Sequence, residues 1–185
     1  MSDVYGLRSA AVATYPMYRG VARAVGMDIV PGGGAHSMAR QVLADWWYDY
    51  DFFYVHIKKT DSAGEDGDFD RKVDLLEEAD ELVASLRELA PEVLIVTGDH
   101  STPSTMGAHS WHPVPLLISS KWSIPTSEAN SFTERCCLNG SIGQIASTSL
   151  MALALAHAAD LDGEASKSCG RLKKGWRSTD FVNHM

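Results

Sequence analysis

The sequence predicts an α/β protein with a mostly parallel sheet and helices on both of its faces. Short apolar runs of strand length alternate along the 185 residues with longer segments of helical spacing, and such alternation is typical of parallel sheets. The run 93–97 is aliphatic and β-branched, as expected of a strand buried on both faces. The segment 70–89 repeats apolar residues every three or four positions, which indicates an amphipathic helix.

The first quarter of the chain predicts two strands and two helices. Residues 7–14 form a strand candidate made of small side chains. Pro16 breaks it and precedes a short helix at 17–25, since proline is tolerated in a first helical turn. A short strand at 27–30 follows. The segment 37–47 then has helical spacing, with three apolar residues on one side: Met38, Val42 and Leu43.

The middle of the chain gives the clearest signals. Residues 51–57 are aromatic and β-branched, which favours a strand. They lead into 58–68, a polar stretch containing glycine that predicts a loop. The helix 70–89 comes next and is ended by Pro91, and the strand 93–97 follows it.

The last third predicts another strand at 114–119, an irregular stretch at 124–137 and an apolar helix at 147–159. We expect one domain over residues 1–160, because a chain of this length can bury a sizeable core. The polar segment 161–185 is expected to be a loosely held tail.

Composition excludes several classes of partner. The formal charge of −8 argues against nucleic acid and against an anionic membrane surface. The three cysteines are odd in number and suggest no disulfide framework and no CxxC zinc motif. The N-terminus does not resemble a signal peptide, and the longest apolar stretch, 149–159, is too short to span a bilayer. We therefore expect a cytoplasmic protein.

Candidate metal ligands follow two of the predicted strands. The strand 93–97 ends at Gly98 and delivers Asp99 and His100, while the strand 51–57 leads to Asp61, Glu65 and Asp66. Ligands in open α/β sheets bind beyond the carboxyl ends of strands, so these groups converge if the strands are neighbours. Carboxylate and imidazole together suit Mn²⁺ or Zn²⁺ better than Ca²⁺. Two such ions would suit an in-line phosphoryl displacement.

Each of these residues has a simpler interpretation. Asp99 could cap a turn, and His100 could be a hydrogen-bonded loop residue. His56, inside a strand, could be a core histidine or could support a site. Acidic residues before the 70–89 helix could serve as solvated caps, and we assign Asp68 and Asp70 to that role. An EF-hand calcium loop is rejected, because Arg71 stands where that loop requires glycine.

Three sequence blocks resemble the archaeal-type cofactor-independent phosphoglycerate mutases of the alkaline phosphatase superfamily. They are Lys59-Thr60-Asp61-Ser62-Ala63-Gly64-Glu65-Asp66, Thr97-Gly98-Asp99-His100-Ser101-Thr102-Pro103 and His109-Ser110-Trp111-His112-Pro113-Val114-Pro115-Leu116-Leu117-Ile118. The segments 132–135 and 140–143 look like a fourth block. The resemblance is to the C-terminal portion of that family and runs along most of this chain.

The resemblance implies an alkaline-phosphatase-like fold and a phosphoserine mechanism for interconverting 3- and 2-phosphoglycerate. It implies that Asp61, Glu65 and His109 hold one metal, and that Asp99 and His100 hold the other. Glu65 stands where the family usually has histidine. His112 stands where the family usually has aspartate, and it could support the ligands together with Asp66 and His56.

The family's N-terminal strand, which carries the nucleophilic serine and a further aspartate ligand, is not in this sequence, and neither is its inserted substrate domain. We therefore assign no catalytic residue here; Ser62 and Ser101 match positions that are not nucleophilic in the family. The expected cofactor is a divalent metal, Mn²⁺ first, with Mg²⁺, Zn²⁺ or Co²⁺ as alternatives.

Three functions follow from this resemblance. The first is the metal-site part of a phosphoglycerate mutase, which acts on a phosphorylated small molecule and is completed by a longer parent protein or a separate N-terminal chain. The second is a metal-dependent phosphatase that uses water in place of serine. The third is a non-catalytic relic that binds a metal or a partner. Self-association through a missing sheet edge is expected in the last two.

Overall fold

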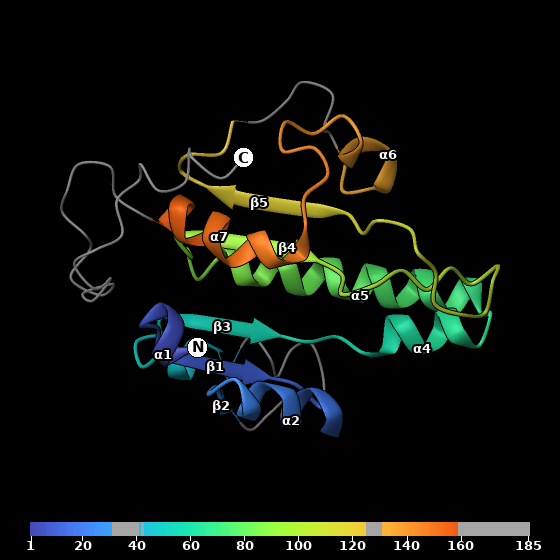
Figure 1. The fold of residues 1–185 in the computed structure, drawn as a ribbon. Coiled ribbons are helices and arrows are strands. Elements are labelled where there is room, and N and C mark those ends of the chain that lie inside the picture. The colour runs from blue at the N-terminus through green and yellow to red at the C-terminus, as the bar shows by residue number, and fades with distance from the viewer. Residues whose placement is uncertain (31–40, 42, 125–130, 159–185) are drawn as a thin grey trace. The chain divides into compact units, whose positions relative to one another are not determined.

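The computed structural model describes residues 1–30, 41, 43–124 and 131–158. Helices and strands alternate, and the α/β class is confirmed (Figure 1). The described residues fall into two compact units, the first within Met1–Ile57 and the second starting at Lys58. We expected one domain over residues 1–160; the segment 161–185, expected to be a tail, lies outside the described residues.

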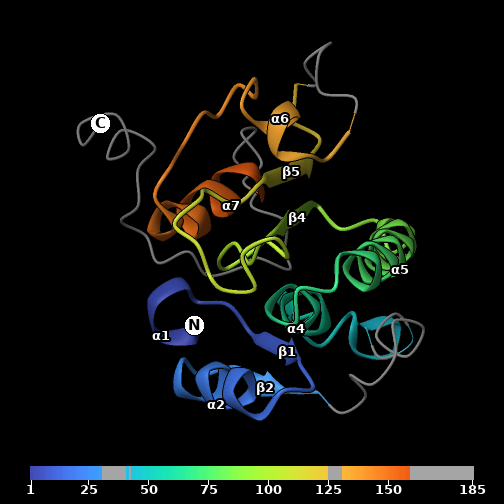
Figure 2. The ribbon, with the colours of Figure 1, turned by 90° about the vertical axis from the view of Figure 1, so that its right-hand side faces the viewer.

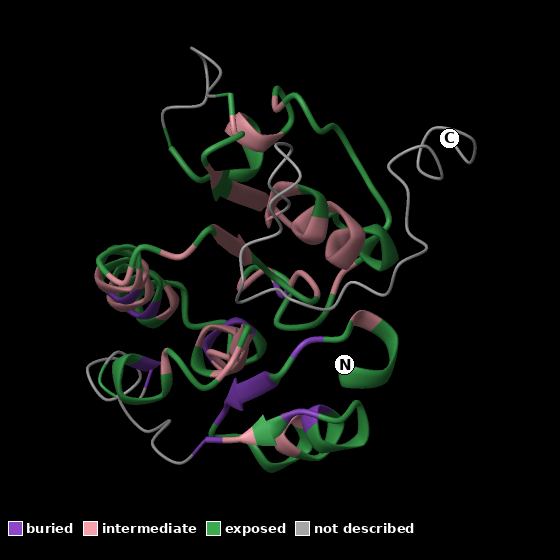
Figure 3. Ribbon diagram, turned by 90° about the vertical axis from the view of Figure 1, so that its left-hand side faces the viewer, coloured by how far each residue is buried: buried purple, intermediate pink, exposed green. Residues whose placement is uncertain are grey.

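The first unit is built on a parallel sheet with strand order β2-β1-β3, formed by β1 (Ser9–Val12), β2 (Asp28–Ile29) and β3 (Phe52–Val55). The central strand β1 is buried along its whole length (Figure 3). Its Ala11 is fully buried and packs with Ala22 of the helix α2 (Pro16–Ala24) and with Met27. Small side chains at these positions let the helix approach the strand closely.

The first unit also contains part of the helix predicted at 37–47 and a short helix that was not predicted. Residues 41 and 43–46 are helical, and Leu43 is 1% exposed, as the predicted apolar side of 37–47 requires. Met38 and Val42 lie outside the described residues. The sequence patterns did not predict the short helix α1 (Ser2–Tyr5), which ends at Gly6 with a φ of 70°.

The second unit contains the antiparallel pair of β4 (Val93–Thr97) and β5 (Leu116–Ser120). Figure 2 shows the long helix α5 (Phe69–Arg87) on one face of this pair and α7 (Leu150–Ala158) on the other. The remaining elements are α4 (Lys59–Glu65), α6 (Glu134–Cys137) and the short 3₁₀ turn η1 (Ser147–Ser149). The described residues contain no helix that is both long and apolar enough to cross a membrane.

Two local expectations are corrected by the structure. The polar stretch 58–68, expected to be a loop, is largely the helix α4, which buries Ala63 and Gly64. The strand expected at 114–119 is observed as β5 at Leu116–Ser120, and in a fold expected to be mostly parallel it pairs antiparallel with β4, because the chain between them turns back on itself. By contrast, the assignment of Asp68 to a helix cap is confirmed: its Oδ1 accepts the backbone N–H of Arg71 at 3.0 Å.

Candidate metal centre

The helix α4 places two of the candidate carboxylates on one side. Asp61 and Glu65 are four residues apart, so one turn of helix brings them to the same face. The helix packs closely against the loop that follows β4. A Cβ atom added to Gly64 would lie 2.4 Å from the carbonyl oxygen of Thr102. Lys72 of α5 donates a hydrogen bond to that same carbonyl, so both helices fix the position of the loop.

The loop after β4 turns back so that His100 and His109 meet. Ser101 and Ser110 form an isolated antiparallel bridge, in which the Ser110 N–H donates to the Ser101 carbonyl at 2.9 Å. Gly107 sits in the turn between them with a φ of 56°, which favours glycine. As a result, the rings of His100 and His109 have centroids 4.0 Å apart.

The candidate ligands form a continuous cluster. Asp61, His100 and His109 each offer a ligand atom, and these atoms lie within 4.8 Å of one another. His109 Nε2 is 3.5 Å from Asp61 Oδ1 and 3.3 Å from Glu65 Oε1. Asp99 joins at the other end, with its Oδ2 at 3.7 Å from His100 Nε2. The structure thus brings together all five residues that the sequence singled out as ligands, and all five belong to the second unit.

Thr102 orients two members of the cluster. Its hydroxyl donates to Asp61 Oδ1 and lies 3.1 Å from His100 Nδ1. Because the single hydroxyl proton goes to the carboxylate, the oxygen accepts from His100, and we assign the imidazole proton to Nδ1. His100 Nε2 then carries the free lone pair. This arrangement is typical of a metal-binding histidine whose other nitrogen is held by a hydrogen bond.

The charge of Asp61 is stabilised from several sides. Burial on its own would raise the pKa of Asp61. Hydrogen bonds from Lys58 and Thr102, together with the charge of Lys58, outweigh burial and hold this pKa below its usual value. Asp61 is accordingly an anion at neutral pH. Its side chain is 14% exposed, whereas Glu65 and His109 are about half exposed at 46% and 55%, which gives the cluster an open side.

The donor set fits a divalent metal. Asp61, His100 and His109 offer ligand atoms within 4.8 Å of one another, and Glu65 Oε1 lies 3.3 Å from His109 Nε2. Mixed oxygen and nitrogen ligands suit first-row divalent ions. The orientation of His100 by Thr102 supplies the supporting hydrogen bond that such sites usually have.

The remaining residues that the sequence suggested lie elsewhere. His112 is exposed; its Nδ1 is 2.9 Å from Ser110 Oγ, and its ring stacks on Trp111. Asp66 is exposed on another face of α4. His56 belongs to the first unit, where it stacks on Tyr18 with ring centroids 3.6 Å apart.

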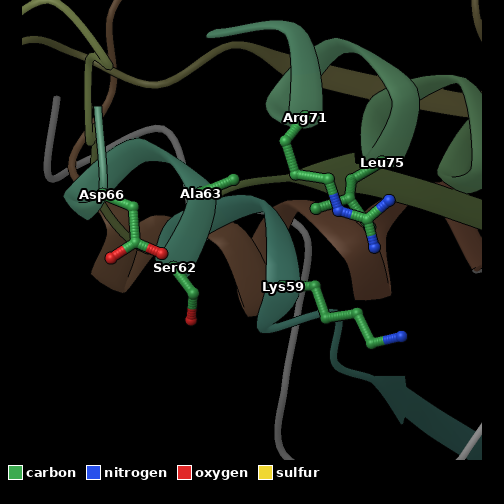
Figure 4. A pocket seen from close by; sticks show the side chains of 6 residues that line it. All are labelled: Lys59, Ser62, Ala63, Asp66, Arg71 and Leu75. Atoms are coloured by element: carbon green, nitrogen blue, oxygen red, sulfur yellow. The ribbon is translucent and has the colours of Figure 1, made fainter. Parts of the chain in front are cut away.

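An open cavity of about 180 Å³ lies on the face of α4 that carries Asp66 (Figure 4). Its lining comes from α4 and α5: Lys59, Ser62, Ala63, Asp66, Arg71 and Leu75. None of the five candidate ligands lines it. The acid–imidazole cluster and this cavity are therefore separate features of the second unit.

Two members of the site were missed by sequence reasoning. Thr102 lies in the same sequence block as Asp99 and His100, two positions after the histidine, and this nearness to predicted ligands was the available signal. Lys58 lies three residues before Asp61, and its Nζ pairs with that carboxylate. A spacing of three residues on a helix would have suggested this pair, but the segment was expected to be a loop.

This fold and this cluster define an α/β domain with a candidate metal centre. The chain matches the family described as the Metalloenzyme superfamily over residues 1–157, and it belongs to that superfamily.

Its relatives narrow the class further. The chain is 50% identical over 160 residues to a protein of Thermotoga maritima, and 48% identical over 164 residues to one of Thermus thermophilus. Both are named probable 2,3-bisphosphoglycerate-independent phosphoglycerate mutases. The matches cover 86% and 87% of this chain but 40% of each relative. The chain thus spans about two fifths of the length of these relatives, and the resemblance noted from its motifs is confirmed.

Solved structures agree with this fold. A Pyrococcus horikoshii protein superimposes with a TM-score of 0.79 at 31% identity, over 84% of this chain and 50% of its own. A cofactor-independent phosphoglycerate mutase from Thermoplasma acidophilum gives a TM-score of 0.66 at 24% identity, over 85% of this chain and 38% of its own. The second similarity concerns the fold alone.

Proposed function

We propose that this chain provides the metal-binding part of a phosphoglycerate mutase that interconverts 3- and 2-phosphoglycerate, a glycolytic reaction of the cytoplasm. The cluster of Asp61, His100 and His109 carries this proposal, because it groups carboxylate and imidazole side chains of the kind that metal-assisted phosphoryl transfer uses. The names of the relatives supply the reaction. Since the chain spans 40% of those relatives, the activity belongs to a longer assembly.

In this proposal the residues of the chain bind the metal ions and orient the side chains that hold them. Asp61, Glu65 and His109 hold one divalent ion, and Asp99 and His100 contribute to a second, as the family resemblance implies. Thr102 keeps His100 in the tautomer whose Nε2 can bind a metal. A bound divalent ion supplies a Lewis acid for the phosphoryl oxygens. The nucleophilic serine and a further aspartate are assigned to the part of the relatives that this chain does not span.

Mn²⁺ is the ion we propose first. The cluster mixes carboxylates with imidazoles, and Mn²⁺ accepts both. Glu65 in place of the family's usual histidine adds an oxygen ligand and moves the preference toward harder ions. Mg²⁺, Zn²⁺ and Co²⁺ are the alternatives to compare with it.

Metal binding by the 185-residue chain tests the site. We expect titration calorimetry with MnCl₂ to show binding that Asp61→Asn weakens by more than about 100-fold, because removing a ligand costs more than removing one of its supporting partners. Asp66→Asn is the matched control: it removes the same charge from another face of the same helix. Equal affinity of the two variants would refute the assignment.

Mixing experiments test the reaction. We expect no mutase turnover from the chain alone. Turnover should appear when it is combined with an N-terminal portion of a relative that bears the serine, and it should be lost with Asp61→Asn. If the chain alone instead hydrolyses p-nitrophenyl phosphate with Mn²⁺, and Asp61→Asn abolishes this, the water-using phosphatase replaces the mutase. Metal binding with neither activity would leave a binding role only.

A further inference from the structure

Lys58 contacts two of the three carboxylates of the centre, Asp61 and Glu65, through the oxygens that do not face the imidazoles. Asp61 presents Oδ1 to Thr102, His100 and His109, while its Oδ2 pairs with the ammonium group of Lys58. Glu65 divides its oxygens in the same way: Oε1 is 3.3 Å from His109, and Oε2 is 3.8 Å from Lys58 Nζ. The side chain of Lys58 is 21% exposed, so this contact is partly shielded from water.

This division of oxygens limits how each carboxylate can bind an ion. A carboxylate that donates both oxygens to one metal must have both of them free. Here one oxygen of Asp61 and one of Glu65 are directed to the ammonium group, and one of each is directed to the imidazoles. Each carboxylate is therefore presented as a ligand with a single oxygen.

We propose that Lys58 is a positioning residue that sets the metal specificity of the centre. Ca²⁺ takes six to eight oxygen ligands and often uses both oxygens of a carboxylate. Smaller ions such as Mn²⁺ need fewer ligands and accept nitrogen. By holding the outer oxygens of both Asp61 and Glu65, Lys58 disfavours Ca²⁺ and retains Mn²⁺. This inference rests on the metal centre of the proposed function.

The test is the ratio of the Ca²⁺ and Mn²⁺ dissociation constants of the 185-residue chain. Mn²⁺ is measured by calorimetry and Ca²⁺ by its displacement of Mn²⁺. Loss of the lysine charge alters the attraction of both dications alike, so their ratio isolates the geometric effect. We expect Lys58→Met to lower the preference for Mn²⁺ over Ca²⁺ about tenfold, the lower end of the effect of partners that orient a ligand.

Three variants make this result specific. Lys59→Met makes the same change at the neighbouring residue, which lines the cavity instead, and should leave the ratio unchanged. Lys58→Arg keeps the charge and the donors and should stay within about twofold of the original chain. Lys58→Gln, which lacks the charge, repeats the test if circular dichroism shows that Lys58→Met does not fold.

The outcomes separate the two proposals. If the original chain binds no Mn²⁺, the metal centre and the role of Lys58 both fall. If it binds Mn²⁺ but the ratio is the same in Lys58→Met and Lys59→Met, only the specificity role is overturned. A lowered ratio in Lys58→Met that Lys58→Arg restores supports it.

Discussion

Gly64 is the residue at which helix α4 and the Thr102 loop come closest. A Cβ there would lie 2.4 Å from the Thr102 carbonyl oxygen and 3.0 Å from Lys72 Nζ. Because the first of these atoms belongs to the backbone and not to a flexible side chain, Gly64→Ala must move the loop or the helix. We expect a loss of about 1–3 kcal/mol in the free energy of unfolding. Weaker Mn²⁺ binding should accompany it, since Thr102 positions Asp61 and His100.

Urea unfolding and calorimetry check this prediction against Gly20→Ala. Gly20 lies at an exposed position inside the helix α2, and an added Cβ there meets nothing within 4 Å. That substitution should be neutral or stabilising by up to about 1 kcal/mol, because alanine favours a helix more than glycine does. Equal effects of the two substitutions would contradict the steric explanation.

Asp51 gives the first unit a pH-dependent contribution to stability. Burial raises its pKa, but hydrogen bonds from the side chain and backbone N–H of Arg8, together with the Arg8 charge, outweigh burial and lower the pKa overall. A carboxyl group with a lowered folded-state pKa stabilises the fold above the pKa of the unfolded chain, about 4. That contribution is lost as the pH falls through the lower, folded-state value.

Asp51→Asn should therefore lower the urea midpoint of the first unit at pH 7. The difference from the original chain should shrink as the pH falls below about 4. Asp49→Asn removes a charge nearby and is the control, with a smaller effect expected at every pH. A difference that stayed constant from pH 7 to pH 2.5 would show that the carboxylate charge is not responsible.

At the residue level, the sequence led to the candidate ligands that the structure brings together, but not to the groups that contact them. Asp61, Asp99, His100 and His109 follow predicted strands or lie in the family motifs, so residue type and order were enough to single them out as candidates. Thr102 and Lys58 act through contacts made only when the Thr102 loop lies against α4. Such contacts depend on tertiary approach, which leaves no periodicity in the sequence.

Among the elements, the strongly periodic segments were predicted well and α4 was not. The helix expected at 70–89 is observed at Phe69–Arg87, and the strand expected at 93–97 has the same bounds. The segment of α4 is polar and contains Gly64, so its local preferences favour a loop. It is helical while burying Ala63 and Gly64, and tertiary packing of this kind can override local propensity.

The N-terminus of α5 offers a test of a single helix end. Asp68 Oδ1 accepts the Arg71 N–H at 3.0 Å, which satisfies one of the unpaired donors of the first turn. We expect Asp68→Ala to cost about 1 kcal/mol of stability. Thermal unfolding would measure this loss, with Asp80→Ala in the middle of the same helix as the control. A control that lost as much would show that the cap hydrogen bond is not the cause.

On the scale of the whole molecule, the parallel sheet and the candidate ligands belong to different units. The parallel sheet and its core of small side chains belong to the first unit, and all five candidate ligands belong to the second. The sequence predicted the alternation of elements that fills both units. It did not predict the division at residue 58, because local patterns do not show which elements share a core.

A metal that binds only the second unit should stabilise that unit selectively. Binding to the folded state adds RT ln(1 + [L]/Kd), about 2.7 kcal/mol at 100 times Kd. Hydrogen exchange with mass spectrometry would measure this for peptides covering β1 and β4. We expect saturating Mn²⁺ to slow exchange at Val93–Thr97 by up to about 100-fold and to leave Ser9–Val12 nearly unchanged.

In Asp61→Asn the protection at β4 should disappear, whereas Asp66→Asn should retain it. Equal protection of both strands would instead show that the two units unfold as one, because binding at the cluster would then stabilise every element alike.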